Sequence, residues 1–291
     1  MPGKLVVGDC VEALKSLPNG CADLVFADPP FNIGYSYDIC KDKWERDEYI
    51  DWIDQWLPQA VRVLKPNGSL WLMIGDDYVC DYKRKIDSLG LILRNWIIWH
   101  YVQCKPTKKR FSHSHCHILY YVADIDNYTF NLEDIRIPSL GITYGRELRN
   151  NPRGKVPNDV WYLHPSESNE LFQTEHDVWF CPRILGNFKE RVNHPTQKPE
   201  ALMERIVKVA TNPGDLVVDP FAGSGTTLAV AKRLGRNYWG CELSPRYAKV
   251  ILDRLAKQGD DDTEVVFLNP QDRQCFYDQN EQLPAEQVNS D

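Results

Sequence analysis

The first segment with residue types suited to chemistry lies near the N-terminus, where the apolar run Leu24–Phe26 leads into Asp28, Pro29, Pro30 and Phe31. Proline has no backbone N–H and fixes its own φ angle, so the two prolines end a strand and stiffen the chain that follows. A rigid loop that carries a carboxylate and an aromatic ring at the end of a buried strand is typical of a ligand platform. An ordinary strand exit would also explain these residues taken alone.

A second such segment, Leu216–Thr227, has the pattern of a buried strand, a turn with Gly223 and Gly225, and the start of a helix. Glycines let backbone N–H groups approach a ligand closely, and a helix N-terminus favours an anionic group. No lysine follows the second glycine and the G-x-G-x-x-G pattern is incomplete, so neither a P-loop nor a full dinucleotide fingerprint is present. Glu242 ends the next expected strand, where an acid can accept hydrogen bonds from ribose hydroxyls. This unit predicts a site for an adenosyl-type ligand.

The elements that must position these segments alternate between strands and helices, which predicts an α/β layered fold with a mostly parallel sheet. The expected strands are Lys4–Val7, Asp23–Ala27, Ser69–Ile74, Leu91–Trp99, His117–Val122, Asp215–Asp219 and Tyr238–Glu242. The expected helices are Val11–Ser16, Tyr49–Leu64, Tyr78–Leu89, Pro199–Ala210, Thr226–Leu234 and Pro245–Gln258. The segment His194–Pro199, HPTQKP, leads into one of these helices, and a helix start bounded by prolines explains it when it stands alone.

The alternating pattern is lost between residues 127 and 189, where Pro, Gly, Asn and Arg are frequent. So long an irregular stretch in a compact domain is usually a functional insertion. We therefore divide the chain into an N-terminal half at 1–126, an insertion at 127–189, a C-terminal half at 190–258 and a polar, poorly ordered tail at 259–291. Within the tail, EVVFL at 264–268 could pair locally as a strand.

The formal net charge of −7 does not by itself indicate a nucleic-acid-binding protein. Phosphate contacts need only a local basic face, however, and basic residues do cluster. The candidate phosphate-binding residues are Lys105, Lys108, Lys109, Arg110, Arg146, Arg149, Arg153 and Lys155, with a solvated surface as the alternative.

Nine cysteines are scattered without a CxxC pair, and no secretory leader pattern or run of roughly 20 apolar residues is present in the sequence. We expect a soluble cytoplasmic protein without a membrane partner. The segment His113–His117 contains three histidines and Cys116, but the spacing is short and the sequence offers no partner for them elsewhere. We therefore expect no metal site.

Taken together, D-P-P-F, H-P-T-Q-K-P and D-P-F-A-G-S-G-T-T followed by Glu242 resemble the S-adenosylmethionine-dependent DNA amino-methyltransferases of the β class, up to about Gln258. The order is specific, because the other groups place the GxG segment before the D-P-P loop. The resemblance implies a Rossmann-like methyltransferase fold with a mostly parallel seven-stranded sheet, a circularly permuted motif order and an inserted target-recognition region at 127–189. It also implies S-adenosylmethionine as the cofactor, S-adenosylhomocysteine as the product and double-stranded DNA as the partner. It leaves open a homodimer and a separately encoded restriction nuclease.

The resemblance also implies roles for individual residues. Asp28, Pro29, Pro30 and Phe31 match the catalytic loop. The implied cofactor-binding residues are Asp9, Cys10, Asp28, His194, Thr196, Gln197, Lys198, Asp219, Phe221, Gly223, Ser224, Gly225, Thr226, Thr227 and Glu242. The segment KKRFSHSHCHIL matches the loop that lines the pocket for the target base.

The implied reaction gives the acid–proline loop a physical purpose. The exocyclic amine of a base is a poor nucleophile, because its lone pair is delocalised into the ring. If Asp28 and the carbonyl of Pro29 accept hydrogen bonds from the amine, the nitrogen can become pyramidal and attack the sulfonium methyl group in line. The base must leave the duplex for this step, and Phe31 can stack on it.

In the resembled family, Asp at the first position of this loop goes mainly with adenine. We therefore expect a site-specific DNA methyltransferase that acts on N6 of adenine. The alternatives are the N4 amine of cytosine and a cofactor-binding nucleic-acid module without catalysis. Methylation at a ring carbon of cytosine usually needs a Pro-Cys pair, whereas this chain has Cys181-Pro182 in the reverse order.

Overall fold

The computed structural model describes residues 3–39, 42–101, 107–137, 153–161, 190–259 and 262–281 (backbone only from 278), and the backbone of two short strands at 172–173 and 178–179. The strands of the main sheet are β1 (Lys4–Val7), β2 (Ala22–Ala27), β3 (Leu64–Ile74), β4 (Ile92–His100), β5 (His115–Val122), β6 (Val160–Trp161), β9 (Leu216–Asp219), β10 (Asn237–Glu242) and β11 (Glu264–Phe267). The helices are α1 (Cys10–Lys15), α2 (Arg46–Arg62), α3 (Val79–Ser88), α5 (Glu200–Ala210), α6 (Thr226–Arg233), α7 (Pro245–Ala256) and α8 (Pro270–Glu281), with a 3-10 turn η1 (Leu132–Ile135). The strands β7 (Phe172–Gln173) and β8 (Val178–Trp179) form a separate pair.

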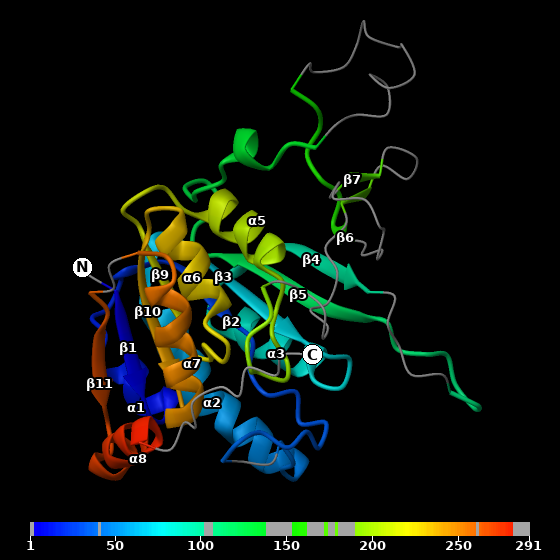
Figure 1. Ribbon diagram of the computed structural model, residues 1–291. Coiled ribbons are helices and arrows are strands. Elements are labelled where there is room, and N and C mark those ends of the chain that lie inside the picture. Colours follow the sequence, from blue (N-terminus) through cyan, green and yellow to red (C-terminus); the bar gives the residue numbers. More distant parts are fainter. Residues whose placement is uncertain are drawn as a thin grey trace, which may run out of the picture.

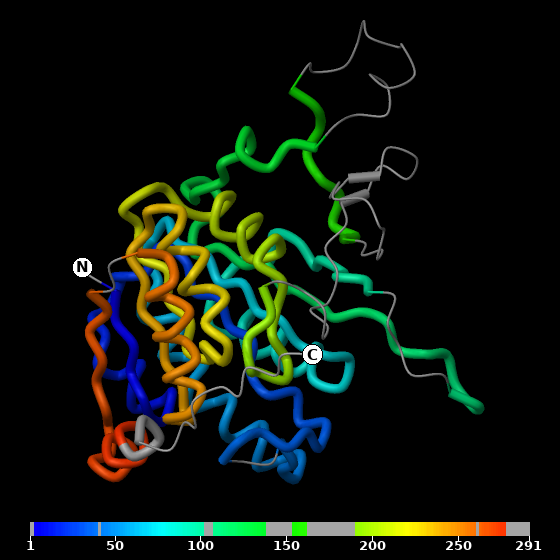
Figure 2. The backbone as a smooth tube through the Cα atoms, viewed as in Figure 1, coloured from blue at the N-terminus to red at the C-terminus, as the bar shows by residue number. Residues whose placement is uncertain are grey.

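The nine strands of the main sheet follow the order β11-β1-β10-β9-β2-β3-β5-β4-β6, and helices cover both faces (Figure 1). β5 runs antiparallel to β3 and β4, whereas the other neighbours are parallel. Figure 2 shows the blue N-terminal strand beside the orange-red strand β11, so segments near the two ends of the chain pair at one edge of the sheet.

The two halves of the chain meet in the middle of the sheet. β2 pairs in parallel with β9, with Leu24 opposite Val217 and Val25 opposite Val218. Because both strands are parallel, their carboxyl ends lie at the same edge. The loops after β2 and β9 are therefore neighbours, although nearly two hundred residues separate them in the sequence.

Successive side chains of each central strand point to opposite faces of the sheet. In β2, Leu24 and Phe26 belong to the buried cluster that includes residues of α5, α6 and α7, whereas Val25 and Ala27 belong to the cluster with α1, α2 and α3. Burial on both faces explains why the sequence of β2 is a continuous apolar run.

Each strand and helix expected from the sequence is present, but three features differ. In the described part of the chain, the sheet has nine strands rather than the seven expected, because β6 and β11 extend its two edges. Residues 65–68, between the expected helix that ends at Leu64 and the expected strand that begins at Ser69, lie within β3, where the pairing with β2 shifts between Leu64 and Ser69. Residues 262–281 lie in the tail that was expected to be poorly ordered apart from local pairing at EVVFL. They form β11 within that segment and also α8, because Val265, Phe267 and Phe276 pack against the core.

Among the described residues, no helix has both the length and the apolar composition that a membrane-spanning segment requires.

Candidate active site

The carboxyl ends of β2 and β9 open into one cavity of about 790 Å³. All of the catalytic and cofactor-binding residues expected from the sequence line this cavity, except Gly225. Gly225 has a φ of +72°, and a Cβ at this position would come within 3.0 Å of Ile251. The absence of a side chain at Gly225 therefore lets the turn before α6 pack tightly against Ile251.

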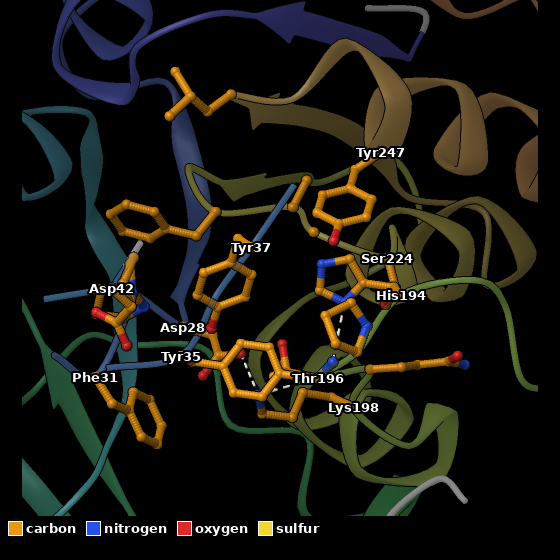
Figure 3. Close-up of a pocket in the computed structure, with 18 of the residues that line it drawn as sticks. Asp28, Phe31, Tyr35, Tyr37, Asp42, His194, Thr196, Lys198, Ser224 and Tyr247 are labelled. Carbon is orange, nitrogen blue, oxygen red and sulfur yellow. Dashed lines mark hydrogen bonds and ion pairs between the residues drawn. The ribbon is translucent and has the colours of Figure 1, made fainter. Parts of the chain in front are cut away.

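Asp28, at the end of β2, forms an ion pair with Lys198 from the HPTQKP segment (Figure 3). Lys198 Nζ contacts Asp28 Oδ2, while Asp28 Oδ1 is buried and accepts no hydrogen bond from any described residue. Burial raises the pKa of Asp28 above its ordinary value, and the adjacent ammonium group opposes this shift. The pair therefore leaves one carboxylate oxygen at the cavity for a donor from a ligand.

The loop after Asp28 is fixed by hydrogen bonds from three directions. The hydroxyl of Tyr49 donates to the carbonyl of Pro30. Asn32, at a positive φ of 56°, donates from Nδ2 to the hydroxyl of Tyr78 at 2.7 Å, and Asp42 accepts from the backbone N–H of Asn32 at 2.7 Å. Such bonds hold the acid–proline loop in one shape, which a catalytic platform needs.

The turn after β9 is organised around two buried carboxylates. Glu242 accepts from the backbone N–H groups of Gly223 and Ser244, both at 2.9 Å, and Asp219 accepts from the N–H of Phe221 at 2.9 Å. Burial raises the pKa of Asp219 and that of Glu242, each to about 7. Together with Asp28, these groups make the cavity favourable for a ligand that carries positive charge.

The HPTQKP segment packs directly on this turn. The imidazole of His194 lies against Gly223, where a Cβ would come within 3.2 Å of Cε1, and it contacts the ring of Tyr247 at 4.5 Å between centroids. Burial, with the charge of Lys198, lowers the pKa of His194 to about 3, so the ring is neutral at pH 7. Thr226 at the start of α6 donates to the carbonyl of Lys198 at 3.1 Å. These contacts bring Lys198 to Asp28.

The side chains of Gln197 and Asp9 form hydrogen bonds with backbone groups around the cavity. The side chain of Gln197 accepts from Val192 N at 2.8 Å and donates to the carbonyl of Glu190 at 2.7 Å. Asp9 caps the N-terminus of α1 by accepting from Val11 N at 2.9 Å. The side-chain hydrogen bonds of both residues therefore support the wall of the cavity.

The loop after the acid–proline segment crosses to the C-terminal half, a connection that the sequence analysis did not predict. Asp38 accepts from Ser244 Oγ at 2.6 Å and pairs with Arg246 at 3.2 Å. Tyr37 lies 6.5 Å from His194 between ring centroids and lines the cavity, as Tyr35 does (Figure 3). The closely spaced tyrosines after Phe31 were the available signal in the sequence.

A protein-family model described as DNA methylase, of the N6/N4 methyltransferase type, matches residues 22–253. The chain belongs to this family. It is 35% identical over 256 residues to the type II methyltransferase M.HpaI of Haemophilus parainfluenzae, which covers 88% of this chain and 74% of that protein. It is 36% identical over 252 residues to the DNA adenine methyltransferase YhdJ of Escherichia coli K12, which covers 86% of this chain and 82% of that protein.

Solved structures of DNA methyltransferases have the same fold as this methylase. A Thermus thermophilus protein described as a DNA modification methylase, complexed with S-adenosyl-L-methionine, aligns with a TM-score of 0.62 at 25% identity and covers 92% of this chain and 99% of that one. The cytosine-N4-specific PvuII DNA methyltransferase aligns with a TM-score of 0.64 at 22% identity, covering 96% and 92% of the two chains. At this identity the second match shows the fold alone.

The basic residues expected to bind DNA fall into separate parts of the methylase. Lys108, Lys109 and Arg110 are exposed between β4 and β5, and Arg110 lines the cavity. Arg153 is exposed and pairs with Glu133 at 3.2 Å, and the backbone of Lys155 pairs with that of Ile137. Lys105, Arg146 and Arg149 lie outside the described residues.

Other side chains that line the cavity of the methylase were not predicted individually from the sequence. One of them, Cys116, belongs to the segment matched to the target-base pocket. Trp99 and Tyr101 come from the end of β4, Cys116 from β5, and Asp76 from the loop after β3. Phe31 lies beside this group, because a Cβ on Gly75 would be 3.3 Å from its ring. Flat apolar surfaces are thus available next to Asp28.

Proposed function

We propose that this methylase transfers a methyl group to N6 of adenine in double-stranded DNA. The observation that supports this most directly is the buried Oδ1 of Asp28, which accepts no hydrogen bond from a described residue, in the cavity that also contains the Gly223 turn. The relative YhdJ, named a DNA adenine methyltransferase, supports adenine as the base. The aspartate at the first position of the D-P-P-F loop supports the same choice.

S-adenosylmethionine is the methyl donor. The cavity fits this cofactor, because its volume of about 790 Å³ suits a ligand of that size. Its carboxylates, Asp28, Asp219 and Glu242, complement the positive charges of the sulfonium and ammonium groups. Glu242 and the Gly223 turn would hold the ribose and methionine parts, and the bound cofactor supplies an electrophilic methyl group.

The chain's own contribution is to prepare the amine. Asp28 Oδ1 and the carbonyl of Pro29 accept the two N–H groups of the target amine, so the nitrogen lone pair is localised rather than spread into the ring. Lys198 holds the other oxygen of Asp28 and favours its ionised form. Phe31 supplies a stacking surface for the base once it has left the duplex.

The exposed loop residues Lys108, Lys109 and Arg110 would bind backbone phosphates at the entrance of the cavity. The region 127–189 would read the target sequence. These assignments predict binding that weakens as salt concentration rises.

The test is to incubate the protein with labelled S-adenosylmethionine and a mixture of unmethylated duplex DNA, and then to identify the labelled nucleoside after digestion. We expect label in N6-methyldeoxyadenosine. Label in N4-methyldeoxycytidine would overturn the choice of base. Absence of label, with cofactor binding shown by calorimetry to be intact, would overturn the proposal that the protein catalyses methyl transfer. Asp28→Ala is the negative control, and Asp126→Asn, an exposed residue of the loop after β5, is the matched positive control.

A further inference from the structure

Four of the seven histidines lie close together, three on the neighbouring strands β4 and β5 and His113 just before β5, and His113 lines the cavity. His113, His115 and His117 alternate along the chain that enters β5, so their side chains share one face of the strand. His100 on β4 lies opposite His115 in the antiparallel register. The proposed methyl transfer uses none of these imidazoles.

A single carboxylate stands at the centre of this group. β3 pairs with β5 with Ile74 opposite His117, and continuing this register places Asp76 opposite His115. Asp76 Oδ2 lies 2.9 Å from His113 Nδ1, and Asp76 Oδ1 lies 3.3 Å from His115 Nε2. The sequence shows no partner for these histidines, and the register of β3 with β5 supplies one.

We propose that Asp76, His113 and His115 form a binding site for a divalent transition-metal ion of the zinc type. One ligand atom from each residue lies within 4.8 Å of the other two. Zinc binds nitrogen and oxygen ligands at about 2.0–2.1 Å, which puts ligand atoms of a tetrahedral site about 3.3 Å apart. The observed separations require only small side-chain movements to meet that geometry. Imidazole and carboxylate ligands favour zinc, cobalt or nickel over magnesium.

His117 supports this site rather than forming part of it. Trp96 Nε1 donates to His117 Nδ1 at 2.9 Å, and an indole N–H is only a donor, so Nδ1 carries no proton. The proton of the neutral ring is then on Nε2, which donates to Asp76 Oδ1 at 2.7 Å. Metal-binding carboxylates are commonly held by such a second hydrogen bond.

The site borders the space proposed for the target base. Asp76 and His113 line the same cavity as Asp28 and Phe31. An ion bound there would reduce the space in the cavity for the target base, without touching Glu242 or the Gly223 turn. We therefore infer that zinc inhibits methyl transfer and leaves cofactor binding intact. This consequence rests on the proposed function, whereas the binding site itself does not.

The binding test uses the full chain with Cys80→Ser and Cys275→Ser, because these two exposed thiols would also bind zinc. We expect calorimetry with zinc chloride to give one ion per chain, cobalt to give the visible spectrum of a tetrahedral site, and magnesium to give no binding. Asp76→Asn, His113→Asn and His115→Asn should each raise the dissociation constant for zinc about tenfold or more. Asp77→Asn, a neighbouring exposed carboxylate, is the matched control and should not change it.

Absence of zinc binding, or equal binding by the three variants, would overturn the site and leave the histidines as hydrogen-bond donors to Asp76. The second measurement compares methyl transfer with and without zinc in each variant, so every protein is its own reference. Zinc should lower transfer in the parent but not in His115→Asn, with unchanged binding of S-adenosylmethionine. Zinc binding without loss of transfer would contradict the placement of the ion beside the target base. Absence of transfer in metal-free parent protein would instead count against the proposed function.

Discussion

Lys198 and Asp28, 170 positions apart in the chain, form an ion pair inside the cavity of this methylase. Both side chains are largely buried, with exposed fractions of 15% and 17%. Burial favours the protonated form of Asp28, and the ammonium group of Lys198 favours the ionised form. The pair thus favours the ionised form of the residue that we propose as the acceptor for the target amine.

Replacing Lys198 by Gln should raise the pKa of Asp28, because the opposing positive charge is lost. The acid limb of the pH profile of kcat should then move to higher pH, and kcat at pH 7 should fall about tenfold for each unit that the pKa of Asp28 exceeds 7. Lys198→Arg keeps the charge and should retain the profile of the parent. If the pH profile of kcat for Lys198→Gln is identical to that of the parent protein, Lys198 does not control the pKa of Asp28.

Replacing Asp28 by Asn should lower kcat about 10²- to 10³-fold, because the acceptor loses its charge in a site that excludes water. Binding of S-adenosylmethionine should persist, since Glu242 and the Gly223 turn are unchanged. Single-turnover methyl transfer and calorimetry measure the two effects separately. Parent-like turnover by Asp28→Asn would remove the proposed role of this residue.

Replacing Glu242 by Gln should raise the dissociation constant for S-adenosylmethionine about tenfold or more. The carboxylate accepts from Gly223 N and Ser244 N, and an amide NH₂ in place of one oxygen would face a backbone donor. Phe221→Ala should have a similar effect, because this ring packs on Trp56 with 4.9 Å between centroids. Unchanged cofactor affinity in both variants would remove this pocket from the proposal.

The pKa values of Asp219 and Glu242, each raised to about 7, predict a pH dependence of cofactor binding. In the free protein these groups keep protons that the unfolded chain loses between about pH 4 and pH 5, so they lower the free energy of unfolding as the pH rises towards 7. A cationic ligand favours their ionised forms, and its affinity should therefore increase up to about pH 7 and then level off.

Thermal unfolding and calorimetry at pH 6 and pH 8 would test this dependence. S-adenosylmethionine should bind about tenfold more weakly at pH 6 than at pH 8. S-adenosylhomocysteine lacks the sulfonium charge and should depend less on pH. Equal pH dependence of the two ligands would show that the carboxylates do not respond to that charge.

Replacing Gly223 by Ala should weaken cofactor binding, an effect separate from its loss of folding stability. Gly223 has a φ of +52°, and a Cβ would come within 3.2 Å of His194. Gly214 is the matched control, because its φ is +89° and a Cβ there would meet no atom of the described residues within 4 Å. Both variants should lose about 1–2 kcal/mol of stability from the left-handed backbone, and only Gly223→Ala should lose affinity. Equal affinity of the two variants would contradict the close packing of His194 on the turn.

Much of the fold could be predicted from the sequence, because the local patterns that mark strands and loops are strong in this chain. The continuous apolar runs of β2 and β9, with Pro29 and Gly223 soon after them, mark strands that end in loops. The motifs D-P-P-F and G-S-G-T-T marked the two loops in the same way. The polar composition of residues 262–281 predicted poor order. A few apolar residues, among them Phe267 and Phe276, are nevertheless enough to dock β11 and α8 on the core.

The sequence by itself determined which residue types form the candidate site: an acid before two prolines, a glycine turn, and an acid at the end of the next strand. Only the tertiary structure decided that these segments share one cavity, since this follows from the parallel pairing of β2 with β9. It alone brought Lys198 to Asp28 and Asp76 to His113. Such contacts depend on strand order and register, and these are set by how whole faces of the sheet are buried rather than by any local pattern.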